Sequence, residues 1–151
     1  MTGSSVEAVY REEGRRLWRA LFAYTADAEV ASDAVAEAFA QALAHERDIR
    51  DISAWVWTTA FRIARGALAE LRRFNEQLPE GTYHMPEQHR DVFDALKGLS
   101  PNQRLIVLLH DYADRSASEI ARTMQISRAT VYVHLSQGRR RLRSTLEDRD
   151  A

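Results

Sequence analysis

The sequence contains no cysteine, and it has only three prolines and six glycines among 151 residues. The absence of cysteine excludes disulfides, thiolate metal sites and cysteine nucleophiles, and it suits a reducing compartment. The longest unbroken aliphatic run is Leu105 to Leu109, far short of the roughly 20 apolar residues that cross a bilayer. The opening "MTGSSVEAVYREEG" lacks the basic start and apolar core of a secretory signal. We therefore expect a cytoplasmic protein that has no membrane partner.

Patterns that would indicate catalysis are also missing from the sequence. No two of the five histidines stand at a metal-ligand spacing, and there is no glycine-rich loop of the kind that cradles phosphates. We therefore expect no enzymatic activity, no metal, no cofactor and no small-molecule substrate.

The formal net charge is −1, but the charges are sorted along the chain. Residues 26–44 include four acids and neither lysine nor arginine, whereas residues 115–143 include seven arginines against a single acid, Glu119. Such sorting favours two partners, one cationic and one anionic. The alternative is that solvated helix faces cluster by sign without functional meaning.

Apolar residues recur every three or four positions, and no stretch alternates with a period of two. This periodicity predicts an all-α fold. In the first half we expect helices over 6–24, 27–44 and 53–73, with Ser53 as the N-cap of the third. Side chains expected in the core include Tyr10, Leu17, Leu21, Val30, Val35, Phe39, Leu43 and Trp55.

A change in amino-acid composition divides the chain into two halves. Residues 75–89 hold two of the three prolines and show no helical stripe, which is typical of a linker. The sequence therefore predicts two small helical domains, 1–74 and 90–151, joined by a flexible linker at 75–89.

The second half contains several helix-start signals. After a short helix over 90–97, Ser100 and Gln103 form a capping box with a proline between them, and Ser116 and Glu119 form another. Ser127 is expected to cap a last helix that reaches about residue 146. The helix that follows Ser100 is expected to bury Leu105, Ile106, Leu108, Leu109 and Tyr112.

The stretch from Ser116 to Ser144 has the spacing of a helix-turn-helix. Its two helices would be sealed by the apolar residues Ile120, Met124, Ile126, Val131 and Leu135. Gln125 occupies the turn position where a left-handed backbone usually calls for glycine, at a cost on the order of 1 kcal/mol. An ordinary helical hairpin with a basic surface is the alternative.

In this motif the second helix enters the major groove of DNA, and its N-terminal residues meet the base edges. Residues that could contact DNA at that end are Ser127, Arg128, Ala129, Thr130, Tyr132 and His134. Phosphate contacts are expected further along the helix, from Arg139, Arg140, Arg141 and Arg143.

Three segments resemble the extracytoplasmic-function (ECF) sigma factors. Leu99 to Arg143 is similar to region 4 of that family, Ala31 to Leu43 to region 2.2, and Ser53 to Arg73 to its tryptophan-bearing helix. The segments occur in the family's order on either side of a linker. The resemblance implies a bacterial transcription initiation factor that binds core RNA polymerase and recognises the −10 and −35 promoter elements.

The resemblance also implies roles for residues of the first half. Asp33 and Glu37, four apart on one helical face, would meet a basic coiled coil of the polymerase beta-prime subunit. Opened −10 DNA would follow a cationic track made of Arg47, Arg50, Arg62, Arg65, Arg72 and Arg73. Trp57 and Phe61 would stack on its bases, unless these rings belong to the core.

The chain departs from the family pattern at several positions. Ser32 and Ala36 replace a glutamate and a glutamine, while Gly66 and Glu70 replace an asparagine and an aspartate. The first pair bears on polymerase binding and the second on promoter melting. The segment from Tyr132 to His134 replaces the usual Lys-Ser-Arg, which should change promoter preference.

Two other functions stay open at this stage. One is a sigma-like decoy that sequesters polymerase or an anti-sigma factor and starts no transcription. The other is a stand-alone helix-turn-helix regulator, which would form a homodimer on a palindromic site. Because many members of the family are held inactive by an anti-sigma factor, such a protein is a further expected partner.

Overall fold

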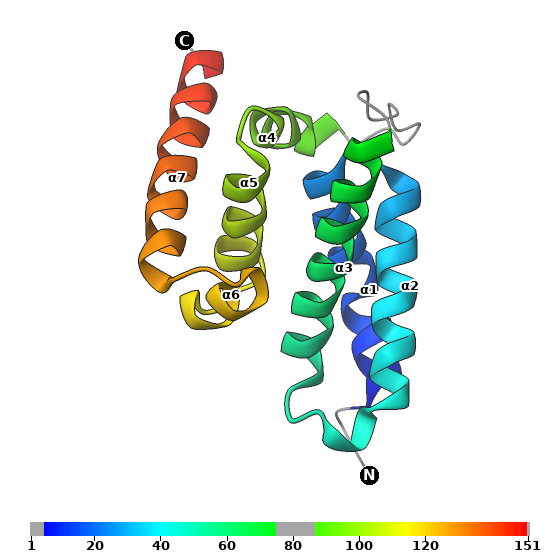
Figure 1. Ribbon diagram of the computed structural model, residues 1–151. Helices are drawn as coiled ribbons and strands as arrows, with labels where there is room; N and C mark the ends of the chain where they lie inside the picture. The colour runs from blue at the N-terminus through cyan, green and yellow to red at the C-terminus, as the bar shows by residue number, and fades with distance from the viewer. Residues whose placement is uncertain (1–4, 75–86, 151) are drawn as a thin grey trace. The chain divides into compact units, whose positions relative to one another are not determined.

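The computed structural model describes residues 5–74 and 87–150, and the regular elements of these residues are all helices (Figure 1). The all-α prediction is therefore confirmed. The chain divides into two compact units, Met1–Gly81 and Thr82–Ala151. Of the predicted linker, residues 75–86 lie outside the described residues, and Glu87 already belongs to a helix.

Unit 1 is a bundle of three helices. It consists of α1 (Val6–Thr25), α2 (Ala28–Ala44), a 3₁₀ turn η1 (Glu46–Asp48) and α3 (Ile52–Phe74). The three long helices pack against one another, and Figure 1 shows them side by side. Fully buried side chains of their shared core are Leu17, Leu21, Val56, Trp57 and Phe61.

Short polar residues start the helices of unit 1. Ser5 caps α1 and Asp27 caps α2, each accepting a hydrogen bond from the backbone N–H three residues on. The predicted cap of α3 was wrong. The helix begins at Ile52, and Asp51 accepts from the Ala54 N–H at 3.1 Å, so Asp51 precedes the first turn.

Unit 2 contains four α-helices and one wide turn. Its elements are α4 (Glu87–Lys97), α5 (Pro101–Val107), the π-helical turn η2 (Leu108–Tyr112), α6 (Ala117–Met124) and α7 (Arg128–Asp150). The long helix α7 contacts α4, α5 and α6. The other three α-helices of the unit therefore all pack against α7.

The helix starts predicted for unit 2 are confirmed. Both capping boxes are present, with Ser100 and Ser116 as N-caps, and the Ser127 hydroxyl accepts from the Thr130 N–H at 3.0 Å. Gln125 has φ 58° and ψ 47°, the left-handed conformation expected for the turn. A non-glycine residue is held there because the helices on both sides of it are packed.

Two features hold the helices of unit 2 close together. A Cβ on Gly138 of α7 would lie 2.9 Å from Val107 Cγ2, so the absence of a side chain lets α7 approach α5. The Arg104 guanidinium donates to the carbonyl oxygens of Leu96 and Leu99 at 2.9 and 3.0 Å, which satisfies acceptors at the end of α4.

Several residues predicted to be buried are not. Tyr10 is 58% exposed, because it lies edge-on against Phe39 at the margin of the bundle. Leu43, close to the end of α2, is 61% exposed. Tyr112 is 38% exposed because the π turn rotates it out of the apolar stripe. Trp55 is only half-buried.

Candidate nucleic-acid interface

The helix-turn-helix consists of α6, a left-handed turn and α7. Ile120 and Met124 of α6 are buried together with Val131 and Leu135 of α7, so the predicted seal between the two helices is present. The turn is closed by the Ile126 N–H, which donates to the Ala121 carbonyl at 3.0 Å. This seal leaves the opposite face of α7 exposed.

The exposed face of α7 presents most of the residues that the sequence assigned to DNA. Ser127, Arg128, Ala129, Tyr132, Arg140 and Arg141 are exposed, and Thr130 and His134 are half-buried. The Thr130 hydroxyl lies 2.8 Å from Ser127 Oγ. The buried Nδ1 of His134 has no hydrogen-bond partner, which makes His134 a poorer base reader than its position suggested. These DNA contacts stay predictions.

Arg139 differs from the arginines beside it because it is paired within unit 2. Its Nε donates to Asp111 Oδ2 at 2.8 Å, and its Nη2 contacts the other oxygen of the same carboxylate. Asp111 also lies 3.0 Å from His110 Nδ1. The hydrogen bonds from Arg139 are the main reason that the pKa of Asp111 lies below its ordinary value. Arg139 thus anchors α7 to the π turn, a role that sequence spacing did not reveal.

In unit 1 the candidate track follows one face of α3. Arg62, Arg72 and Arg73 are exposed and Arg65 is half-buried. At 100° per residue, the four side chains lie within about 100° of one another around the helix, which places them on one side. The half-buried Trp55 belongs to the same side, seven residues before Arg62. Arg47 and Arg50, in and after η1, are also exposed.

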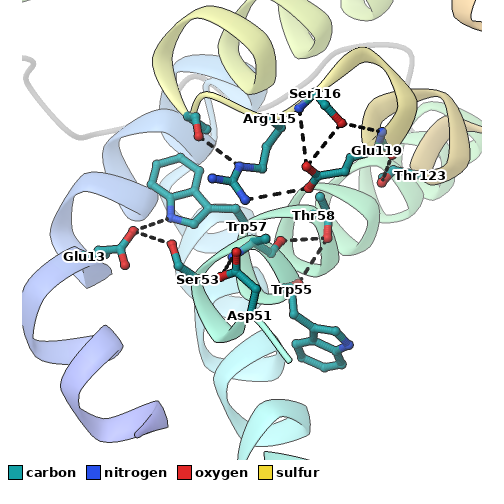
Figure 2. Close-up of polar contacts among 12 residues, drawn as sticks. Glu13, Asp51, Ser53, Trp55, Trp57, Thr58, Arg115, Ser116, Glu119 and Thr123 are labelled. Carbon is teal, nitrogen blue, oxygen red and sulfur yellow. Dashed lines mark hydrogen bonds and ion pairs between the residues drawn. The ribbon is translucent and has the colours of Figure 1, made fainter. Parts of the chain in front are cut away.

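The rings predicted to stack on bases are part of the core. Trp57 and Phe61 are 2% and 0% exposed and stack on each other with centroids 6.4 Å apart. The Trp57 indole N–H donates to Glu13 Oε1 at 3.1 Å, and Ser53 Oγ donates to the same oxygen at 2.8 Å (Figure 2). This burial leaves neither ring face open to a base, and it favours the alternative, that both rings belong to the core, over the predicted stacking.

Of the two tryptophans of α3, Trp55 is the one that lies on the outward side of the helix. Figure 2 shows its ring pointing away from the Glu13–Trp57 contact. The expectation that Trp55 is a core residue and Trp57 a candidate for stacking is therefore reversed. Glu13, to which no sequence pattern pointed, accepts the indole N–H of the buried Trp57.

The acidic face of α2 carries the candidate polymerase contacts. Asp33 and Glu37 are both exposed, and Glu37 accepts from the Gln41 amide at 2.9 Å. Ser32, one of the departures from the family pattern, accepts from the Trp18 indole at 3.0 Å. Ser32 therefore joins α2 to α1, while the side chains of Asp33 and Glu37 point to solvent.

A metal centre and a membrane-spanning helix are both absent from the part of the chain that the structure describes. In residues 5–74 and 87–150, no group of three or more His, Asp or Glu side chains could hold a metal ion. Over the same part of the chain, no helix is long and apolar enough to cross a membrane.

The chain is similar to known sigma factors. Residues 84–142 match the family described as Sigma-70, region 4. The "ECF RNA polymerase sigma factor SigL" of Mycobacterium tuberculosis is 29% identical over 161 residues, which cover 95% of this chain and 89% of the relative. Over 95% of its length the chain is thus similar to an ECF sigma factor. The "RNA polymerase sigma-E factor" of Streptomyces antibioticus is 39% identical over 79 residues, or 50% of this chain; the match spans about half, 44%, of the length of that relative.

A solved structure shows the same sigma-factor fold. The sigma factor RpoE from Bartonella quintana, crystallised in complex with the anti-sigma factor NepR, matches with a TM-score of 0.70 and 21% identity. The match covers 88% of this chain and 91% of that one. The helical architecture on both sides of residues 75–86 is therefore that of a known sigma factor.

Proposed function

We propose that this chain is a transcription initiation factor that binds core RNA polymerase and directs it to specific promoters. The observation that carries the proposal is the exposed face of α7. It belongs to a sealed helix-turn-helix, and residues 128–143 hold five arginines and no acid. Such a surface suits the phosphates and base edges of a major groove, and in this family that surface serves the −35 element.

We further propose that unit 1 engages the −10 element along the outward face of α3. The arginines of that face supply a cationic track, and Trp55 supplies a ring at its start. Single-stranded DNA is bound by this combination of a positive groove and stacking surfaces. The proposal replaces Trp57 and Phe61 with Trp55 as the stacking residue.

Polymerase binding is assigned to the acidic face of α2, with the coiled coil of the beta-prime subunit as its partner. The test is co-elution of the purified chain with core RNA polymerase. An Asp33→Arg, Glu37→Arg double variant should lose co-elution. A Glu12→Arg, Glu147→Arg variant carries the same charge change on exposed positions of α1 and α7, and it should keep co-elution. Failure of the unaltered chain to co-elute would contradict polymerase docking and leave the stand-alone regulator.

Run-off transcription separates an initiation factor from a decoy. Polymerase supplied with this chain should give transcripts that start at defined positions on genomic fragments. Co-elution without any such transcript would favour the decoy. Because a sigma factor of the same fold was crystallised with an anti-sigma factor, we also propose an anti-sigma protein as a regulatory partner.

A further inference from the structure

Two large apolar side chains lie exposed next to each other on α7. Tyr132 and Val133 are 57% and 53% exposed, in the second turn of the helix. Isolated apolar residues are common on protein surfaces. Here, however, two of them stand at the centre of the face that the helix-turn-helix turns outward, and both would gain from removal from water.

The surroundings of this pair indicate what would cover it. Arg128 and Ala129 lie one helical turn before the pair, and Arg140 lies two turns after Val133, all of them exposed. The partner must therefore be anionic at the margins and apolar at the centre. The major groove of DNA has this pattern wherever a thymine C5-methyl group stands between two phosphate backbones.

We propose that Tyr132 and Val133 select promoters with thymine in the −35 element by direct contact with thymine methyl groups. The two side chains point about 100° apart around the helix, so they face neighbouring base pairs. Ala129, one turn earlier, has no long side chain that would hold the backbone away from the groove floor. This inference rests on the proposed function, because it specifies what the α7 face reads.

The test removes the methyl groups without changing the base pairing. Duplexes retained by the full chain together with core RNA polymerase are first selected from a random pool. Each thymine of the selected −35 segment is then replaced by uracil, which lacks only the C5-methyl group. One or two of these replacements should weaken binding about fourfold each, as expected for the loss of one buried methyl-sized contact.

Variants assign the effect to this face. Val133→Ala and Tyr132→Ala should each remove the discrimination between thymine and uracil at one position. Val92→Ala is the matched control, since Val92 of α4 is 45% exposed in the same unit, and it should leave the discrimination unchanged. Circular dichroism should show all three variants as helical as the parent chain.

The outcomes are distinct. If uracil has no effect at any position, or weakens binding equally in the parent and in both α7 variants, the thymine assignment is wrong while promoter binding stands. Full-strength DNA binding by the variants with unchanged discrimination would leave a protein as the occupant of the apolar pair. Selection of no DNA sequence at all would overturn the proposed function and this inference together.

Discussion

Replacing Gly138 by alanine tests the close approach of α7 and α5. The new Cβ would lie 2.9 Å from Val107 Cγ2, closer than carbon atoms normally come, and it would also contact Gln103 Cβ at 3.4 Å. Overpacking of this kind costs about 1–3 kcal/mol, whereas alanine is preferred over glycine in a helix interior by about 1 kcal/mol. We therefore expect a net loss of up to roughly 2 kcal/mol in the free energy of unfolding of unit 2. Each kcal/mol lost should lower the melting temperature of a unit of this size by roughly 4–8 °C.

The matched control is Gly66→Ala on the exposed face of α3. Nothing lies within 4 Å of the Cβ that would be added there, so only the helix preference acts, and unit 1 should gain about 1 kcal/mol. Because the two variants lie in different units, hydrogen exchange resolved by peptide is the suitable assay. Protection should fall in α5 and α7 of the first variant and rise in α3 of the second. Increased protection of α5 and α7 by alanine at position 138 would refute the argument from close packing.

Three further predictions test individual contacts. Arg139 lowers the pKa of Asp111 in the folded state, so the pair stabilises unit 2 above about pH 4 and this stabilisation is lost as the pH falls further. Asp111→Asn should remove that contribution. Acid titrations followed by circular dichroism should show a difference in the free energy of unfolding below about 1 kcal/mol at neutral pH, because the pair is largely exposed. Arg140→Ala should reduce the slope of log K for DNA binding against log salt concentration by about 0.9. Arg139→Ala should reduce it by less, because the Arg139 guanidinium is already paired with Asp111, and equal reductions would contradict this. Glu13→Ala should destabilise unit 1 by about 1–3 kcal/mol in urea titrations, because the buried Trp57 indole loses its acceptor, whereas Glu13→Gln should cost less.

The fold could be predicted from the sequence wherever its signals are local. A capping box involves residues three apart, so Ser100 with Gln103 and Ser116 with Glu119 mark helix starts without knowledge of tertiary structure. The left-handed backbone at Gln125 could also be predicted, because Gln125 lies in the turn between two helices whose starts are marked by Ser116 and Ser127. The cap of α3 was missed because Asp51 and Ser53 both suit that position, and a contact 40 residues away decides between them.

The candidate site was harder to predict because it depends on contacts between distant segments. Trp55 and Trp57 are two residues apart and therefore point about 200° apart on a helix, so only one of them can face the core. The three- and four-residue spacing of Trp57, Phe61, Ala64 and Leu68, which are all buried, marks the core face, and Trp55 lies outside it. The hydrogen bond from Trp57 to Glu13, across 44 residues, could not be predicted from such spacing. In the same way, the pairing of Arg139 with Asp111 depends on where the π turn places the carboxylate.

The wide turn η2 affects how this chain aligns with its relatives. A π turn contains one more residue than an α-helical turn over the same span. A relative whose helix continues regularly through this region will therefore need a one-residue gap between positions 107 and 113. Alignment without that gap would pair residues from helix faces about 100° apart. A chain that lost the extra residue would rotate the position of Asp111 away from α7, so the insertion and the aspartate should be inherited together.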